Sequence, residues 1–233
     1  IMMKNHIFHI PVITEENIFK GIFVSDNLIE ENLIEETFFI LAGGKGLRMG
    51  QLTKNMPKPM LSISGKPMIE LIIMNAKEYG FRNFVISIGY LGKVIQDYFG
   101  NGEKLGVKIS YIKEDKPLGT AGSLSFLKKQ QLSDYIFVTN GDVVTTLEYS
   151  NMLNFAKDRN CDGVIGVKEY EMKNPFGVIE SENGDLIEIS EKPTYKSTIN
   201  AGVYVISRRL ISLIKIGEYI DMTDLFERGL ANK

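Results

Sequence analysis

Apolar residues along this chain show two kinds of spacing, one typical of buried strands and one typical of helices. Short apolar runs bounded by turn-forming residues predict buried strands at 38–41, 84–88, 107–112 and 135–139. Between them, apolar residues recur at helical spacing and predict helices at 69–79, 92–99 and 121–130. Strands that alternate with helices predict an α/β fold with a mainly parallel central sheet and helices on both faces.

The pattern changes toward both ends of the chain. After residue 162 the apolar runs predict shorter strands at 164–167, 178–180, 186–189 and 201–206. Before residue 37, two short strands are expected at 7–13 and 18–24, followed by a helix that Ser25 caps and that carries Leu28, Ile29, Leu33 and Ile34 on one side. We therefore expect two parts, residues 1–36 and 37–233.

Composition and charge exclude several classes of protein. The 233 residues allow one α/β domain with a small appendage, and a net charge of −2 argues against nonspecific binding to nucleic acid or membrane surfaces. No apolar run approaches the roughly 20 residues of a membrane span, and the first residues do not resemble a signal peptide. The single cysteine, Cys161, cannot form an internal disulfide, so we expect a cytoplasmic protein. Because an apolar run follows it at 164–167, we expect its thiol to be buried.

The strand at 38–41 runs directly into the sequence Leu41-Ala42-Gly43-Gly44-Lys45-Gly46-Leu47-Arg48. Glycines let backbone N–H groups approach a phosphate closely. Between residues 37 and 69 there are five basic residues and no acidic one. The spacing fits neither a P-loop nor the dinucleotide-binding fingerprint, so the segment predicts a different kind of phosphate site.

A second polar group follows another strand. Asp142 lies in Asn140-Gly141-Asp142, just after the strand at 135–139. In an open parallel sheet, ligands bind outside the carboxyl ends of the strands. The glycine segment (residues 41–48) and Asp142 are therefore expected at the same end of the sheet.

These motifs carry a family resemblance. The segment Leu41–Arg48, with Leu52-Thr53 and Pro57-Lys58-Pro59-Met60-Leu61, resembles the signature of sugar-1-phosphate nucleotidyltransferases, most of all the mannose-1-phosphate guanylyltransferase-like branch. The resemblance covers about residues 37–230. Leu47 and Gln51 stand where the family usually has Thr and Pro. It implies a Rossmann-like nucleotidyltransferase fold and transfer of a nucleotidyl group, GTP being the expected donor, to a sugar 1-phosphate.

The resemblance also implies roles for particular residues. Arg48 and Lys58 are expected at the triphosphate, and Asp142 at Mg²⁺. The nucleotide-binding residues it implies are Leu41, Ala42, Gly43, Gly44, Gly46, Gly119 and Thr120. The residues it implies for the sugar phosphate are Gly177, Glu191, Lys192 and Asn200. Thr120 is also expected to cap the helix at 121–130, and Glu114 receives no catalytic role.

Several alternatives stay open at this point. The donor base can instead be that of CTP, UTP or dTTP, or the chain can be an inactive nucleotide-sugar-binding regulator; a homo-oligomer is also open. The family continues into a Trp-x-Asp-x-Gly segment that holds a second metal-ligating Asp, whereas this chain has no Trp, so we expect truncation at the C-terminus. Residues 1–36 resemble the closing half of a CBS repeat, through Ile10-Pro11-Val12 and Gly21-Ile22-Phe23-Val24-Ser25.

Overall fold

The computed structural model describes residues 9–15, 17–24, 33–44, 46–127 and 132–232. The chain divides into two compact units, residues 1–34 and 35–233. In the first unit, β1 (His9–Ile13) pairs antiparallel with β2 (Phe19–Val24). Residues 25–32, where the helix after Ser25 is expected, lie outside the described residues. Leu33 and Ile34 are not helical, because the chain is already extended as it enters the next strand.

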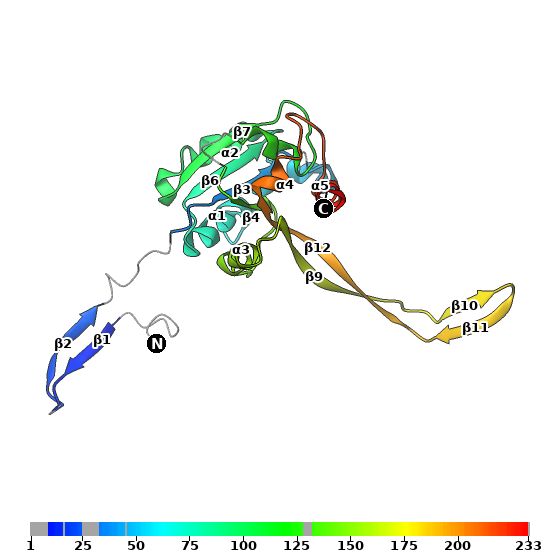
Figure 1. Cartoon of the computed structure of the whole chain (residues 1–233), viewed down its shortest axis with the longest axis horizontal. Helices are drawn as coiled ribbons and strands as arrows, with labels where there is room; N and C mark the ends of the chain where they lie inside the picture. Colours follow the sequence, from blue (N-terminus) through cyan, green and yellow to red (C-terminus); the bar gives the residue numbers. More distant parts are fainter. Residues whose placement is uncertain (1–8, 16, 25–32, 45, 128–131, 233) are drawn as a thin grey trace. The chain divides into compact units, whose positions relative to one another are not determined.

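The second unit is built on a six-stranded sheet (Figure 1) with the order β7-β6-β3-β8-β12-β9. Its strands, in chain order, are β3 (Thr37–Ala42), β6 (Asn83–Ile88), β7 (Lys108–Lys113), β8 (Tyr135–Asn140), β9 (Gly163–Lys173) and β12 (Thr194–Ser207). The first four in spatial order are parallel, while β12 runs antiparallel to both β8 and β9. The sheet is mixed and mostly parallel, as predicted.

Helices and short turns connect these strands. The α-helices are α1 (Met68–Glu78), α2 (Gly92–Phe99), α3 (Tyr149–Asp158), α4 (Arg208–Ile211) and α5 (Met222–Ala231). The 3₁₀ segments are η2 (Leu47–Thr53), η3 (Lys58–Met60), η4 (Glu103–Leu105) and η5 (Gly122–Phe126), and β4 (Ser62–Ile63) pairs with β5 (Lys66–Pro67). Among the described residues, no helix has the length and apolarity needed to span a bilayer.

The sheet is covered on both faces because successive side chains of a strand point to opposite sides. Phe38 of β3 stacks on Phe137 with ring centroids 4.8 Å apart and also contacts Tyr149 of α3. Its neighbour Phe39 belongs to the cluster on the other face, which includes residues of α4 and α5 such as Leu210 and Leu225. Phe38 and Phe39 are both fully buried.

One helix prediction needs correction, and one helix was not predicted. The stretch 121–130 forms only the 3₁₀ segment η5, and Leu127 is already non-helical while 128–130 lie outside the described residues. The N–H of Ala121 donates to the carbonyl of Ile220 at 3.0 Å, and Gly122 leaves no room for a side chain beside the Glu218 carbonyl. Contacts with the segment before α5 therefore determine this stretch. Helix α3, in contrast, was not predicted, although its four buried residues recur at helical spacing.

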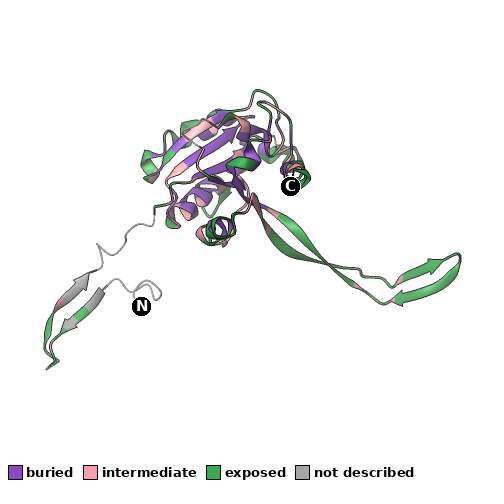
Figure 2. Ribbon diagram, in the orientation of Figure 1, coloured by how far each residue is buried: buried purple, intermediate pink, exposed green. Residues whose placement is uncertain are grey.

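Beyond Val167, β9 and β12 continue as a two-stranded ribbon that leads to the hairpin of β10 (Val178–Glu182) and β11 (Asp185–Ser190). We call residues 168–200 the arm. Figure 2 shows the arm exposed along nearly its whole length, in contrast to the purple sheet strands. The strands here extend further than predicted, because pairing continues after the buried apolar run ends.

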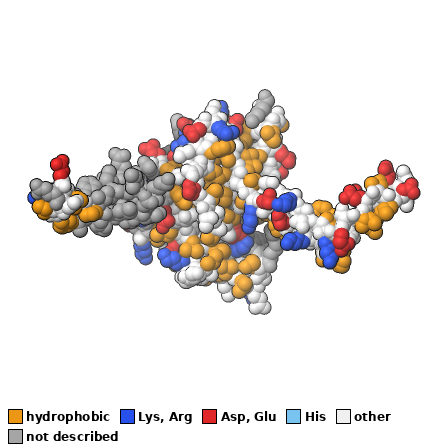
Figure 3. Space-filling view, turned by 90° about the horizontal axis from the view of Figure 1, so that it is seen from below, with side chains coloured by type: hydrophobic (Ala, Val, Ile, Leu, Met, Phe, Trp, Pro, Cys, Tyr) orange, Lys and Arg blue, Asp and Glu red, His pale blue; other side chains and the backbone are white. Residues whose placement is uncertain are grey.

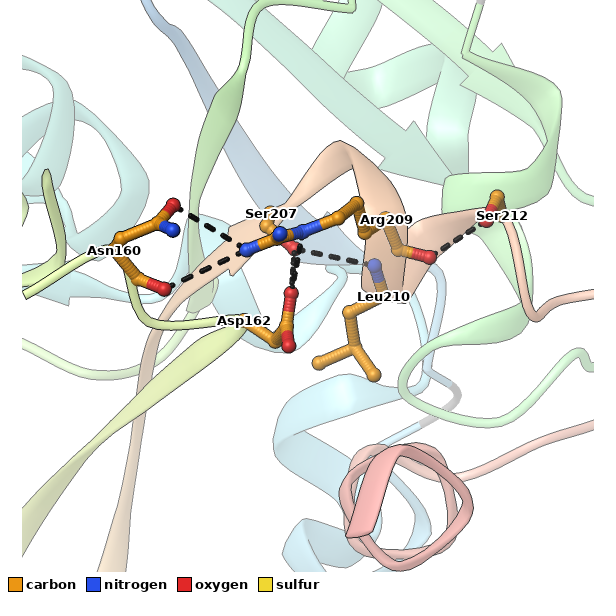
Figure 4. Close-up of polar contacts among 6 residues, drawn as sticks. All are labelled: Asn160, Asp162, Ser207, Arg209, Leu210 and Ser212. Atoms are coloured by element: carbon orange, nitrogen blue, oxygen red, sulfur yellow. Dashed lines mark hydrogen bonds and ion pairs between the residues drawn. The ribbon is translucent and has the colours of Figure 1, made fainter. Parts of the chain in front are cut away.

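A polar cluster fastens the start of β9 to the end of β12 (Figure 4). The Ser207 hydroxyl accepts from the Leu210 N–H at 3.2 Å, capping α4, and donates to Asp162 at 3.2 Å. Arg209 Nε lies 2.8 Å from the same carboxylate, and its Nη2 reaches the side chain of Asn160 at 3.3 Å. Since β12 is antiparallel to β8, this cluster lies at the sheet edge where β8 begins.

Candidate active site

The glycine segment closes over the carboxyl end of β3. Its backbone is hydrogen-bonded to the Asn140-Gly141-Asp142 motif that follows the neighbouring strand β8, because the N–H of Gly141 donates to the carbonyl of Leu41 at 2.8 Å. Gly46 has φ of 61°, a left-handed conformation that glycine adopts without cost. Its carbonyl accepts from the Thr53 hydroxyl at 3.0 Å, which holds the turn into η2.

A cleft of about 1130 Å³ opens at this edge. Its lining contains the predicted nucleotide residues Leu41, Ala42, Gly43, Gly44, Gly46, Gly119 and Thr120, together with Lys58 and Asp142. β3 is the strand at which the order reverses, since the chain runs from β3 outward to β6 and β7 and then returns to β8 on its other side. Such a switch point is where open α/β sheets bind ligands.

Lys58 and Asp142 face each other inside the cleft. The ammonium of Lys58 donates to Oδ2 of Asp142 as a charged hydrogen bond between residues 84 positions apart. Both side chains remain partly accessible, at 37% and 28% exposure. The Lys-Asp pair therefore stays open to a ligand that could bind either charge.

The side chain of Arg48 and the whole of Lys45 lie outside the described structure, although the backbone of Arg48 belongs to η2. The prediction that Arg48 contacts the triphosphate therefore stays a prediction.

The loop before η5 forms another wall of the cleft, and the chain near α5 holds it in place. Gly119 has φ of 74°, and a Cβ there would lie 2.4 Å from the carbonyl of Ile220. The N–H of Thr120 donates to Oδ1 of Asp221 at 3.0 Å, and the Thr120 hydroxyl accepts from the N–H of Met222 at 2.7 Å. Thr120 therefore accepts from the first N–H of α5, whose N-cap is Asp221, and the expectation that it caps a helix at 121–130 is wrong.

Asp221 also influences a tyrosine of the cleft. Its carboxylate raises the pKa of Tyr219, which lines the cleft and donates its hydroxyl to Asp221 at 3.3 Å. Sequence reasoning missed Tyr219, because it lies roughly a hundred positions from the loop that it joins and no local pattern marks it.

Glu114 is a further cleft residue, and it was assigned no catalytic role from the sequence. It follows β7 directly, and its carboxylate accepts from the hydroxyl of Ser87, a fully buried residue of β6. The same carboxylate lies against the glycine segment, since a Cβ on Gly43 would come within 2.7 Å of Oε1. Asn140, Tyr90 and Lys116 also line the cleft without having been assigned. Of these, Asn140 was detectable, because it ends a buried strand.

A smaller cavity of about 400 Å³ adjoins the first. Asn140 and Asp142 line both cavities, and Asn200 of β12 lines the smaller one. Oδ1 of Asn200 accepts from the N–H of Gly202 at 2.9 Å, which fixes the amide orientation. The structure thus brings Asn200 to the same carboxylate as the nucleotide residues.

The other three predicted sugar-phosphate residues are not brought there. Gly177, Glu191 and Lys192 belong to the arm and line neither of the two cavities. Gly177 and Glu191 are neighbours, since a Cβ on the glycine would lie 2.9 Å from Oε2. Lys192 has φ of 49°, a left-handed conformation that costs a non-glycine residue about 1–2 kcal/mol.

Asp142 fits a magnesium ion only together with a ligand. Within the described residues, no three His, Cys, Asp or Glu side chains gather as a metal site would require. Mg²⁺ is commonly held by one or two carboxylates plus substrate phosphates. An accessible carboxylate at the mouth of a glycine-lined cleft satisfies that donor set.

Comparison with known proteins agrees with this geometry. A model of the family described as Nucleotidyl transferase matches residues 38–231. The catalytic subunit beta of mannose-1-phosphate guanylyltransferase from Dictyostelium discoideum is 35% identical over 183 residues, 76% of this chain and 51% of that protein. The UTP–glucose-1-phosphate uridylyltransferase of Synechocystis is 29% identical over 208 residues, 81% of this chain and 54% of that protein.

Among solved structures, a putative glucose-1-phosphate thymidylyltransferase from Bacillus anthracis, in complex with a sucrose, superposes with a TM-score of 0.61 at 25% identity. The match covers 84% of this chain and 83% of that one. This chain spans about half the length of the curated relatives that it matches. Residues 1–37 lie outside the family match.

Proposed function

The chain belongs to the nucleotidyl transferase family, and from this premise we propose that it transfers a nucleotidyl group from a nucleoside triphosphate to a sugar 1-phosphate. An oxygen of the sugar phosphate attacks the α-phosphorus, the bond from that phosphorus to the β-phosphate bridging oxygen breaks, and pyrophosphate leaves. The products are a nucleoside diphosphate sugar and pyrophosphate.

One observation carries the proposal: Asp142 lines both cavities while paired with Lys58. A nucleotide in the larger cleft and a sugar phosphate in the smaller one would meet at this carboxylate. The family resemblance of the glycine segment supports the first assignment, and Asn200 supports the second.

The residues act by position and charge. A phosphate monoester has its second pKa near 6, so the attacking oxygen is already ionised at neutral pH and no base has to remove a proton. The backbone N–H groups of the glycine segment hold phosphate oxygens, and the ammonium of Lys58 neutralises charge that accumulates on the departing pyrophosphate. Asp142 would hold Mg²⁺, which supplies further neutralisation when bound.

GTP is the proposed donor. Sequence likeness to a mannose-1-phosphate guanylyltransferase supports it, while the likeness to a uridylyltransferase keeps UTP as the second candidate. We further propose a cytoplasmic location, consistent with a single, half-buried cysteine at position 161.

The test is release of pyrophosphate. The protein is incubated with Mg²⁺, mannose 1-phosphate or glucose 1-phosphate, and each triphosphate in turn. Release with one triphosphate supports the proposal and assigns the base. Nucleotide binding without release would favour the inactive regulator, and absence of both would refute the function.

Two carboxylate variants sharpen this test. Asp142→Asn should reduce Mg²⁺-dependent turnover at least about 100-fold, a loss typical of removing a charged transition-state contact. Asp162→Asn serves as the control, because Asp162 belongs to the cluster at the other sheet edge (Figure 4) and should affect stability without this loss. Full activity of Asp142→Asn would refute the metal assignment.

For the N-terminal segment we propose a CBS-like module. The antiparallel hairpin of β1 and β2 fits two strands of such a repeat. A shift in melting temperature of the protein on addition of AMP or ATP, lost when residues 1–34 are deleted, would support a regulatory ligand there; an unchanged shift would refute it.

A further inference from the structure

A tyrosine of the cleft makes a contact that the proposed transfer does not explain. Tyr90 lines the cleft and is 40% exposed. Its hydroxyl donates to the main-chain carbonyl of Lys54 at 2.9 Å, across 36 positions of the sequence. We call residues 49–57 the connecting segment, because they join the glycine segment to Lys58. The contact therefore links the end of β6 to the part of the chain that lies between two phosphate-binding groups.

The sheet determines where the side chain of Tyr90 begins. β6 is the parallel neighbour of β3, so the residues that follow the two strands lie at the same end of the sheet. Gly89 follows β6, and a Cβ on it would lie 2.6 Å from the carbonyl oxygen of Gly43. Leu91 takes a left-handed conformation, with φ of 54°, as the N-cap of α2. Tyr90 thus lies between a close backbone contact and the start of a helix.

The connecting segment has few other contacts that hold it in place. Seven of its nine residues are exposed, and only Thr53 and Pro57 are buried. Its remaining hydrogen bonds close local turns. Among the described residues, the bond from Tyr90 to Lys54 is the one hydrogen bond that joins this segment to a part of the chain beyond residues 46–60.

Charge opposes this position of the segment when no anion is bound. Residues 46–58 contain three basic residues and no acidic one. Lys58 is paired with Asp142, but the connecting segment contains no acidic residue that could pair with Lys54. Because like charges on a short, exposed segment repel one another, a bound polyanion would favour the position that repulsion opposes.

We infer that Tyr90 is a positioning residue that pre-organises the connecting segment, and with it the basic residues on either side, for the triphosphate. Tyr90 acts through the Lys54 carbonyl and does not touch the reacting atoms. A segment that is already in its bound position raises affinity, because binding does not have to order it. This inference rests on the proposed function, since it names a residue that supports the phosphate end of that site.

The decisive variant is Tyr90→Phe, which keeps the ring and removes only the hydroxyl. Loss of one such hydrogen bond should raise the KM for the triphosphate about 3- to 10-fold. At saturation kcat should change less than about 2-fold, because bound triphosphate restores the position of the segment. The KM for the sugar 1-phosphate should stay nearly constant. A fall in kcat with an unchanged KM would make Tyr90 a catalytic residue and overturn the inference.

Limited digestion with trypsin measures the position of the segment without catalysis. The Lys54–Asn55 bond is a trypsin site at the contact itself, whereas the bond after Lys58 precedes Pro59 and resists trypsin. Cleavage after Lys54 follows the fraction of molecules in which the segment has opened. In Tyr90→Phe this cleavage should therefore accelerate about 3- to 10-fold. GTP with Mg²⁺ should slow it in both proteins.

The control is Tyr111→Phe, which removes the same kind of bond from another part of the sheet. The hydroxyl of Tyr111, in β7, donates to the carbonyl of Gly100 at 2.7 Å, and Tyr111 lines neither cavity. Urea denaturation should show similar losses of stability in the two variants, whereas only Tyr90→Phe should change the KM and the cleavage after Lys54. Equal acceleration of that cleavage in both variants would overturn the inference, because it would reflect global stability.

The two proposals can fail separately. If wild-type protein turns over a triphosphate and Tyr90→Phe changes neither the KM nor the cleavage, only the role of Tyr90 is wrong. A raised KM without faster cleavage would indicate direct contact with the nucleotide, and faster cleavage without a raised KM would show that binding does not need the contact. Either result overturns the inference.

If no triphosphate is turned over, equilibrium dialysis of the triphosphates replaces the KM. Weaker binding by Tyr90→Phe, together with faster cleavage after Lys54, then supports the positioning role without catalysis. Equal binding by the two proteins refutes that role, and absence of binding by the wild type refutes both proposals.

Discussion

The central sheet and the arm differ in how far their apolar side chains are buried. Phe38, Phe39 and Phe137 in the sheet are fully buried, whereas Ile179 and Ile189 in the arm are 66% and 61% exposed. Figure 3 shows apolar side chains on the surface of the arm beside acidic and basic ones. A two-stranded ribbon is marginally stable in water on its own, so the sheet is held by its core and the arm by strand pairing.

The arm has a pattern of its own. Tyr170, Met172 and Tyr195 share one face of the β9–β12 ribbon, while Lys196 bonds to Glu169 and Glu171 on the other. The arm thus has one face with apolar and aromatic side chains and one charged face, but no packed core.

This difference explains where the motifs lie. Glycine-segment residues and Asp142 follow strands fixed by a packed core, and they meet in one cleft. Glu191 and Lys192 lie within the arm, where no packed core holds them in place, and they line neither cavity. The roles predicted for Glu191 and Lys192 at the sugar phosphate therefore stay predictions.

Removing one aromatic ring from the sheet and one from the arm should give the largest difference in stability between the two regions. Phe38→Ala should lower the free energy of unfolding by about 3–5 kcal/mol, because it leaves a cavity among packed rings. Phe176→Ala, at a residue 73% exposed, should change it by about 0.5 kcal/mol or less. Urea denaturation measures both, and similar losses would show that the arm is as well packed as the sheet.

Adding a methyl group to one glycine of each region gives a smaller effect. Gly119→Ala should cost about 2–3 kcal/mol, because its left-handed φ and the Ile220 carbonyl both oppose a Cβ. Gly184→Ala in the β10–β11 turn, with φ of 94° but no atom within 4 Å, should cost about 1–2 kcal/mol from backbone strain alone. Nucleotide affinity should fall only in Gly119→Ala, as equilibrium dialysis would measure.

Loss of the α5 cap is expected to be milder still. Asp221→Ala should lower the free energy of unfolding by about 1–2 kcal/mol, because it removes the N-cap carboxylate and its bond to Thr120. Hydrogen exchange at the Thr120 amide should accelerate. Asp185→Ala in the arm is the control and should leave exchange at that amide unchanged. No acceleration in Asp221→Ala would refute the stabilising role of the hydrogen bond between Thr120 and Asp221.

The smallest effect is a dependence on pH. Hydrogen bonds from Arg228, and then the backbone N–H of Lys215, lower the pKa of Glu218 from 4.5 to about 2. A lowered folded-state pKa stabilises the protein above the unfolded value, and this stabilisation disappears as pH falls from about 4.5 toward 2. Denaturation midpoints of the wild type should therefore fall more steeply over that range than those of Glu218→Gln, and parallel curves would contradict the shift.

The parallel strands, and the meeting of the glycine segment with Asp142 at one end of the sheet, could be predicted from the residues alone, because buried strands have a local apolar signature and the carboxyl ends of parallel strands lie together. The same reasoning was wrong about residues 121–130 and did not assign Glu114 or Tyr219. These depend on partners distant in sequence: Gly122 packs against the Glu218 carbonyl, Glu114 against Ser87, and Tyr219 against Asp221. They could be recognised only in the folded chain, since a hydrogen bond or a close backbone approach between distant segments leaves no periodic pattern in either segment alone.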